Sequence, residues 1–162
     1  MTLEQYMQTY HVPKKSVIHD VASATGLDIT LTAGVEVPYP CIPVSRDYQV
    51  DNYPLWDEDT SIYKDTIDNS LVFVKFNPIL SGQKGNYVAI KIYIPHPTFG
   101  NLLVDTITKP FTDNNTDEPM TFATWQYNGD DSDAKTYGFY VTITALTTNA
   151  ILRSTTIAIA VP

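Results

Sequence analysis

The sequence predicts an all-β fold: an antiparallel β-sandwich of about eight strands with a short N-terminal helix. Three observations support this prediction. Apolar and polar residues alternate with a period of two over most of the chain after residue 16, the alternating runs are rich in β-branched and aromatic residues, and turn-forming residues rather than helical patterns separate the runs. Strands that follow one another without intervening helices form antiparallel sheets, so we expect either an immunoglobulin-like sandwich or a jelly roll.

The first segment of the chain, residues 1–12, has a helical rather than a strand period. Its apolar residues are spaced as on one face of a helix: Leu3, Tyr6, Met7 and Tyr10. Pro13 ends this pattern, and we expect residues 16–162 to form a single β-sandwich domain. A helix this short is marginal alone in water, so its apolar face packs either on the β core of its own chain or on a neighbouring subunit.

The strands are expected where the alternation is clearest: residues 16–22, 27–33, 71–76, 87–94, 102–109, 120–127, 137–146 and 154–161. Among them, YVAIKIYI at 87–94 alternates aliphatic residues with Tyr87, Lys91 and Tyr93, which predicts one buried face and one outer face that carries tyrosines. Turns are expected at residues 77–86, 128–135 and 147–150.

Residues 34–69 are a long proline-rich and acidic segment without a period, and they hold four of the eleven prolines. Long unpatterned segments in compact domains are usually functional or mobile, so we expect specific function here. Cys41, the only cysteine, lies among apolar residues and prolines in this segment. No internal disulfide is possible, and we expect the thiol to be a small buried group rather than a reactive one.

The distal half of this segment contains YPLWDEDTSIYKDT, residues 53–66, in which Trp56 precedes Asp57, Glu58 and Asp59. Three interpretations remain open. A solvated acidic loop is the ordinary reading of such a charge run. The second is a Ca²⁺ site, although the residue order of an EF-hand loop is absent. In the third, Tyr53 and Trp56 anchor a protein partner, as aromatic side chains often do at interfaces.

Two further acidic loops, residues 113–118 and 128–133, flank the strand that carries Trp125. If both loops lie at one end of the sandwich, their acids share an edge: Asp113, Asp117, Asp130, Asp131 and Asp133. Such an edge could hold calcium, but Asp and Asn are also ordinary turn residues. We therefore expect no resident metal or cofactor, with Ca²⁺ as the alternative.

Aromatic residues beside polar loops also suggest a carbohydrate site, in which a ring packs on the apolar face of a sugar. The candidate residues are Trp56, Trp125, Tyr127 and Asn128. A tryptophan on a strand is more often part of the core, because its large ring stabilises the fold when buried.

Charge and motifs exclude several classes of function. Eighteen acidic against ten basic residues leave a net charge of −8, which disfavours binding to nucleic acid or to anionic membranes. Neither an apolar signal segment nor a membrane-spanning run is seen, so we expect synthesis and retention in the cytosol. The three histidines are scattered and no catalytic motif occurs, so we assign no catalytic residues and expect no enzyme.

The sequence therefore favours a non-enzymatic structural or assembly protein. We expect protein partners, a homo-oligomer or a larger assembly, with Leu3, Tyr6, Met7, Tyr10, Tyr53 and Trp56 as the partner-binding residues. An accessory component of a phage or virus capsid, in a decoration or fibre role, fits this description and would place the protein in the virion. The alternative is a carbohydrate-binding or adhesin-like module, and a hydrolase within the acidic clefts is a third hypothesis.

Overall fold

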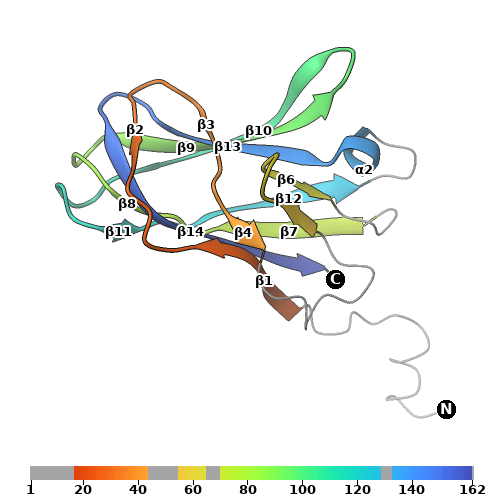
Figure 1. The fold of residues 1–162 in the computed structure, drawn as a ribbon, viewed down its shortest axis with the longest axis horizontal. Helices are drawn as coiled ribbons and strands as arrows, with labels where there is room; N and C mark the ends of the chain where they lie inside the picture. The colour runs from red at the N-terminus through yellow and green to blue at the C-terminus, as the bar shows by residue number, and fades with distance from the viewer. Residues whose placement is uncertain (1–16, 44–54, 65–69, 129–132, 162) are drawn as a thin grey trace, which may run out of the picture.

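A computed structural model describes residues 17–43, 55–64, 70–128 and 133–161. In these residues the chain forms antiparallel strands in an eight-stranded and a six-stranded sheet, and Figure 1 shows the two sheets as the layers of a sandwich. The predicted N-terminal helix lies outside the described residues. Within the described residues, no helix is both long and apolar enough to cross a membrane.

The eight-stranded sheet is organised around its longest strand, β14, Ala150–Val161. One edge of β14 pairs first with β2 and then with β1, and its other edge pairs first with β8 and then with β7. The strands of this sheet besides β14 are β1 Val17–Ala24, β2 Ile29–Leu31, β4 Ile42–Pro43, β7 Ser70–Phe76, β8 Ile79–Ser81, β11 Glu118–Pro119 and β12 Phe122–Asn128.

The six-stranded sheet has the order β10, β9, β13, β6, β5, and β3 pairs with β13 beyond β6. A five-residue helix, α2 Asp133–Tyr137, precedes β13 and packs on β9. The strands of this sheet are β3 Val37–Pro38, β5 Leu55–Asp57, β6 Ile62–Lys64, β9 Tyr87–His96, β10 Gly100–Pro110 and β13 Phe139–Ala145.

The chain crosses repeatedly from one sheet to the other, as after β8, β12 and β13. Side chains from both sheets therefore meet between the layers. The large side chains of this core have almost no exposed surface: Leu31, Tyr39, Tyr63, Phe76, Leu80, Ile90, Ile92, Phe111, Phe122, Phe139, Ile143 and Leu152. Burial of this apolar surface is the main stabilising contribution to the fold.

The all-β antiparallel fold and the eight predicted strands are confirmed, with shifted ends. In β9 the two predicted faces are seen, because Ile90 and Ile92 are buried and Tyr87 is exposed. By the same alternation Ala89 is predicted on the outer face with Tyr87 and Tyr93, but it is 1% exposed.

The sequence did not predict the short elements. Strands β3, β4, β5 and β6 lie in the segment that has no period, β8 lies in the expected turn at 77–86, and α2 begins in the expected turn at 128–135 and ends just beyond it. Strands of two or three residues are too short to show an alternation of apolar and polar residues.

Candidate functional site

The β9–β10 hairpin is the feature of the described molecule that most resembles an interaction surface. Strand β10 is at the edge of its sheet and pairs with β9 alone among the described strands. Figure 1 shows the outer end of this hairpin, in green, projecting away from the two layers. Along β10 the row of backbone groups that faces away from β9 is therefore available to another strand.

The projecting end of this hairpin is apolar and uncharged. Its large exposed apolar side chains, which we call the apolar tip, are Phe99, Leu102, Leu103 and Val104. Phe99 is 73% and Leu103 is 57% exposed, and the stretch FGNLLV from 99 to 104 contains no charged residue in a chain of net charge −8. Soluble proteins usually protect such an edge with charges or proline, so an apolar one indicates an interaction site.

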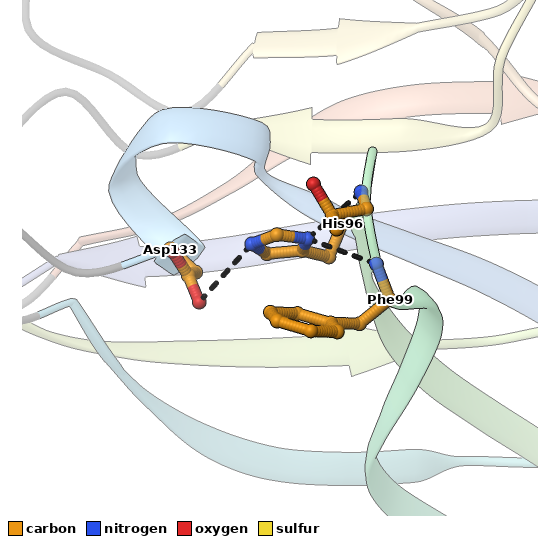
Figure 2. Close-up of polar contacts among 4 residues, drawn as sticks. His96, Phe99 and Asp133 are labelled. Atoms are coloured by element: carbon orange, nitrogen blue, oxygen red, sulfur yellow. Dashed lines mark hydrogen bonds and ion pairs between the residues drawn. The ribbon is translucent and has the colours of Figure 1, made fainter.

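His96 anchors the turn of the hairpin, as Figure 2 shows. Its Nδ1 atom accepts hydrogen bonds from the backbone N–H groups of Thr98, at 3.0 Å, and Phe99, at 3.2 Å. The imidazole ring packs on the Phe99 ring, with centroids 4.6 Å apart, and against the edge of Tyr137 on α2 at 5.2 Å. On the other side of the ring, Nε2 lies 3.9 Å from Oδ2 of Asp133. The histidine thus connects the turn to α2.

The base of the hairpin is tied to the neighbouring sheet. Thr124 of β12 donates a hydrogen bond from its hydroxyl to Oδ2 of Asp105 on β10, at 2.5 Å. Within the described residues β12 pairs only with β7, so β10 and β12 are two edge strands on the same side of the sandwich. Trp125 follows Thr124, is 60% exposed, and packs on Phe73 with ring centroids 5.0 Å apart.

The inner part of β9 carries a polar cluster on the outer face of the sheet. Glu36 accepts a hydrogen bond from the Tyr93 hydroxyl at 2.6 Å and pairs with Lys91 at 3.0 Å. Burial raises the pKa of Tyr93 to about 12, and the bond to Glu36 adds to this rise. Burial alone would raise the pKa of Glu36, but the bonds from Tyr93 and Lys91 outweigh it and lower that pKa. This cluster fixes the strand below the projecting end.

The structure gives Trp56 a position that differs from the predicted one. The side chain is 4% exposed, its indole N–H donates to the carbonyl of Cys41 at 2.8 Å, and its ring meets the edge of Tyr39 at 6.3 Å. Trp56 is therefore a core residue, and its ring is not on the surface as partner or sugar recognition would require. Strand β5 turns this ring inward, although its neighbours Asp57 and Glu58 are exposed.

The acidic run after Trp56 forms a solvated turn. Oδ1 of Asp57 accepts hydrogen bonds from the backbone N–H groups of Asp59, at 2.9 Å, and Thr60, at 3.3 Å. These bonds are typical of an Asp that begins a turn. The predicted partner-binding residues Leu3, Tyr6, Met7, Tyr10 and Tyr53 lie outside the described residues.

The other predicted glycan residues are on β12. Trp125 is exposed, as that hypothesis requires. The backbones of Tyr127 and Asn128 continue the same strand, and their side chains lie outside the described part of the molecule.

Cys41 is buried and free, as predicted. Burial raises the pKa of its thiol to about 11, against an opposing hydrogen bond with Thr155. The thiol is therefore protonated at neutral pH and is a poor nucleophile.

Of the acids expected to share an edge, Asp113 and Asp117 lie apart from Asp133, and Asp130 and Asp131 lie outside the described residues. The loop of Asp113 and Asp117 lies near β11, and Asp133 begins α2 at the opposite end of the sandwich, because the seven residues of β12 separate the two loops (Figure 1). Glu118 accepts bonds from the N–H groups of Thr112 and Asp113, and Asp117 pairs with Arg153 at 3.4 Å. Among the described residues, no three histidine, cysteine, aspartate or glutamate side chains are grouped as metal ligands.

Our sequence analysis missed the apolar tip. Residues 102–109 are correctly predicted as a strand, but the three consecutive apolar residues Leu102, Leu103 and Val104 interrupt the alternation. Successive side chains of a strand point to opposite faces of the sheet. A run of three apolar residues therefore places at least one apolar side chain on the face that points away from the core. That interruption was the available signal.

Comparisons with known proteins agree with the fold. No protein-family model matches the chain, and no curated protein matches it in sequence. Two solved structures are similar to it over most of its length. Eiger TNF from S. frugiperda has a TM-score of 0.53 and 9% identity and covers 92% of this chain and 94% of its own. The PRD1 vertex protein P5 has a TM-score of 0.56 and 9% identity and covers 90% of this chain and 72% of its own. The shared feature is the antiparallel β-sandwich.

Proposed function

We propose that this protein is a non-enzymatic structural component that associates with copies of itself through the outer edge of β10. The observation that carries the proposal is the apolar, uncharged and projecting edge of the β9–β10 hairpin. Among the described strands the eleven-residue β10 pairs with β9 alone, which leaves the backbone groups along its other side open to a further strand, and Leu103 and Phe99 offer apolar surface at its end. Edge-to-edge pairing would bury both, and a second copy of the same edge is a matched partner.

Electrostatics favour this location over the rest of the surface. At a net charge of −8 two copies repel each other, and the stretch 99–104 without charges is where that repulsion is weakest. We expect association to strengthen with added salt, because salt screens the repulsion and leaves apolar burial intact.

The strand order supports a jelly roll rather than an immunoglobulin-like sandwich. In the immunoglobulin order the first and last strands belong to different sheets. In this protein β1 and β14 are paired side by side within one sheet.

The likeness to the PRD1 vertex protein P5, whose name places it at a vertex, is consistent with an accessory capsid component in a decoration or fibre role and with a virion location. At 9% identity this analogy rests on the fold alone. The proposal involves no cofactor, no nucleic acid and no membrane.

The test compares the mass in solution of the full chain with that of Leu103→Lys, measured by light scattering over a range of concentrations. We expect the full chain to exceed the monomer mass of 18.1 kDa as concentration rises, and Leu103→Lys to remain monomeric. Thr108→Lys is the matched control, since it adds the same charge at an exposed position nearer the base of β10. A full chain that stays monomeric throughout would contradict the proposal.

The same measurement of mass in solution distinguishes association through the edge of β10 from association through the predicted N-terminal arm. If Leu3, Tyr6, Met7 and Tyr10 carry the association, deletion of residues 1–12 lowers the mass and Leu103→Lys does not. If the edge of β10 carries it, the two results are reversed.

Exposure of Trp125 supports a second candidate function, a carbohydrate-binding module. The Trp125 ring contacts Phe73, and most of its surface remains exposed to solvent, as a ring that packs on a sugar requires. We expect binding to a glycan array to be lost in Trp125→Ala and kept in the Leu103→Lys variant. An array without signal for the unmodified chain would remove this candidate.

A further inference from the structure

We propose that His96 is a proton-controlled cap on the turn of the hairpin, which regulates the association surface proposed above. The neutral ring holds residues 96–99 in the geometry that presents the apolar tip, and protonation of the ring releases them. The cap itself is inferred from the contacts of His96, and its effect on association rests on the proposed function.

The first step of the argument is the protonation state that the turn requires. Nδ1 accepts two backbone N–H groups, from Thr98 and Phe99, and an imidazole nitrogen accepts only when it carries no proton. The proton of the neutral ring is therefore on Nε2, the nitrogen that faces Asp133 in Figure 2. The two hydrogen bonds of the turn thus require the tautomer that carries its proton on Nε2.

The second step is what an added proton does. The proton enters at Nδ1 and then faces two N–H donors at 3.0 and 3.2 Å, so both hydrogen bonds are lost and like partial charges meet. The turn can relieve this contact only by moving Thr98 and Phe99 away from the ring or by rotating the ring itself. Either movement also disrupts the packing of Phe99 on the imidazole.

The third step weighs the opposing group. The titratable groups that the described residues bring to the ring are Asp133 and Tyr137, both on α2. The Asp133 carboxylate favours a charged ring, but it lies 3.9 Å from Nε2 and its side chain is 54% exposed, so water screens the attraction. The ion pair involves Nε2 and cannot restore the two bonds that a protonated Nδ1 loses, so the charged ring is the state with the open turn.

The consequence concerns the apolar tip. Phe99 lies directly after the capped turn, and Gly100 begins β10 with a φ of +74°, a conformation available mainly to glycine. When the cap is released, the residues that lead into β10 gain freedom, and association must then restore their order. Histidine changes its charge between about pH 5 and 8, so mild acidification weakens the association.

The experiment is an NMR titration of the full chain from neutral to about pH 5, the range in which histidine titrates. It follows the His96 ring and the amide protons of Thr98 and Phe99. We expect these two amides to shift and lose exchange protection together with the ring titration. His96→Asn is the matched variant, because its side-chain oxygen can accept the same two bonds and has no proton to gain. Its amides should not change over this range.

A second variant tests the opposing carboxylate. In Asp133→Asn the charged ring loses its ion pair, so we expect the transition of the Thr98 and Phe99 amides to move to more acidic pH. Amides that remain unchanged while the His96 ring titrates would overturn the cap.

The effect on association is measured separately by light scattering at the two ends of the titration. We expect at least about tenfold weaker association of the unmodified chain in acid, as the loss of two backbone hydrogen bonds implies, and no such change in His96→Asn. If the amides respond but the association constant does not, the regulatory role is wrong and the cap stands. If no association occurs at either pH, the proposed function fails, and the amides alone decide the cap.

Discussion

Two regions of this protein contrast in how regular their sequence is and in where they lie. The strands from β3 to β6 come from a proline-rich segment without a period, yet they bury Tyr39, Cys41, Trp56 and Tyr63 in the core. The β9–β10 hairpin comes from more regular strand sequence, yet it ends in an exposed apolar tip. A regular alternation of apolar and polar residues thus indicates that a segment is a strand, whereas the burial of its side chains depends on whether other elements cover them.

The contrast follows from position within the sheets. Strands β3 and β6 pair with the inner strand β13, β4 pairs with the inner strand β1, and β5 lies against β4 and β6, so their side chains meet the core that both sheets share. Among the described strands β10 pairs on one side only, and the outer end of its hairpin with β9 projects away from the two layers (Figure 1). An edge position exposes even residues that are typical of a core.

The largest expected effect is on the buried tryptophan. Trp56→Ala removes a ring that contacts Tyr39 and leaves the Cys41 carbonyl without its donor, so we expect the free energy of unfolding to fall by about 3–5 kcal/mol. Trp125→Ala is the matched control on the surface, with an expected change within about 1 kcal/mol. Urea denaturation measures both. Similar losses at the two positions would erase the contrast between the regions.

A smaller effect is expected at Gly138, where β13 begins beside β6. Its φ is +76°, and a Cβ atom there would lie 2.7 Å from Cγ2 of Ile62 and 2.8 Å from the Tyr63 carbonyl oxygen. Backbone strain and overpacking together should make Gly138→Ala cost about 2–4 kcal/mol. Gly26→Ala is the control, because its φ is +66° but nothing lies within 4 Å, and strain alone should cost it about 1 kcal/mol. Equal losses in urea denaturation would show that the close approach to β6 contributes nothing.

The next effect appears only at alkaline pH. Burial raises the pKa of the Cys41 thiol from an ordinary 9.0 to about 11, so the folded state holds this proton more tightly than the unfolded state does. The resulting stability is fully present below pH 9.0 and is lost as pH rises through about 11. We expect the unmodified chain to lose about 2–3 kcal/mol more than Cys41→Ala over this range, since each pKa unit corresponds to about 1.4 kcal/mol. Parallel curves for the two proteins would contradict a buried thiol.

The smallest expected effect on stability is at the apolar tip. Leu103→Lys should change the free energy of unfolding by less than about 0.5 kcal/mol, because the side chain contacts mainly solvent in the single chain. Its effect on association should nevertheless be complete. A large loss of stability in this variant would mean that the hairpin end packs within its own chain.

The fold class and the main strands could be predicted from the sequence. An alternation of apolar and polar residues is a local property, and β9 and β14 show it over many residues. Burial of Cys41 could also be predicted, because its neighbours are apolar and a thiol seldom lies in water. Absence of helical periods in most of the chain and the turn-type connections were sufficient to favour antiparallel sheets.

Only the tertiary structure decided which aromatic and acidic residues lie at the surface. Trp56 and Trp125 both occur beside polar residues on strands at the end of a pairing order, but β5 lies against β4 and β1, which cover Trp56, whereas the Trp125 side chain on β12 is 60% exposed. The acids Asp113 and Asp133 lie at opposite ends because β12 runs between them, and His96 meets Asp133 and Tyr137 because α2 packs on β9. Local sequence sets which element a residue joins, but pairing between distant strands sets what lies beside it, and no short pattern contains that information.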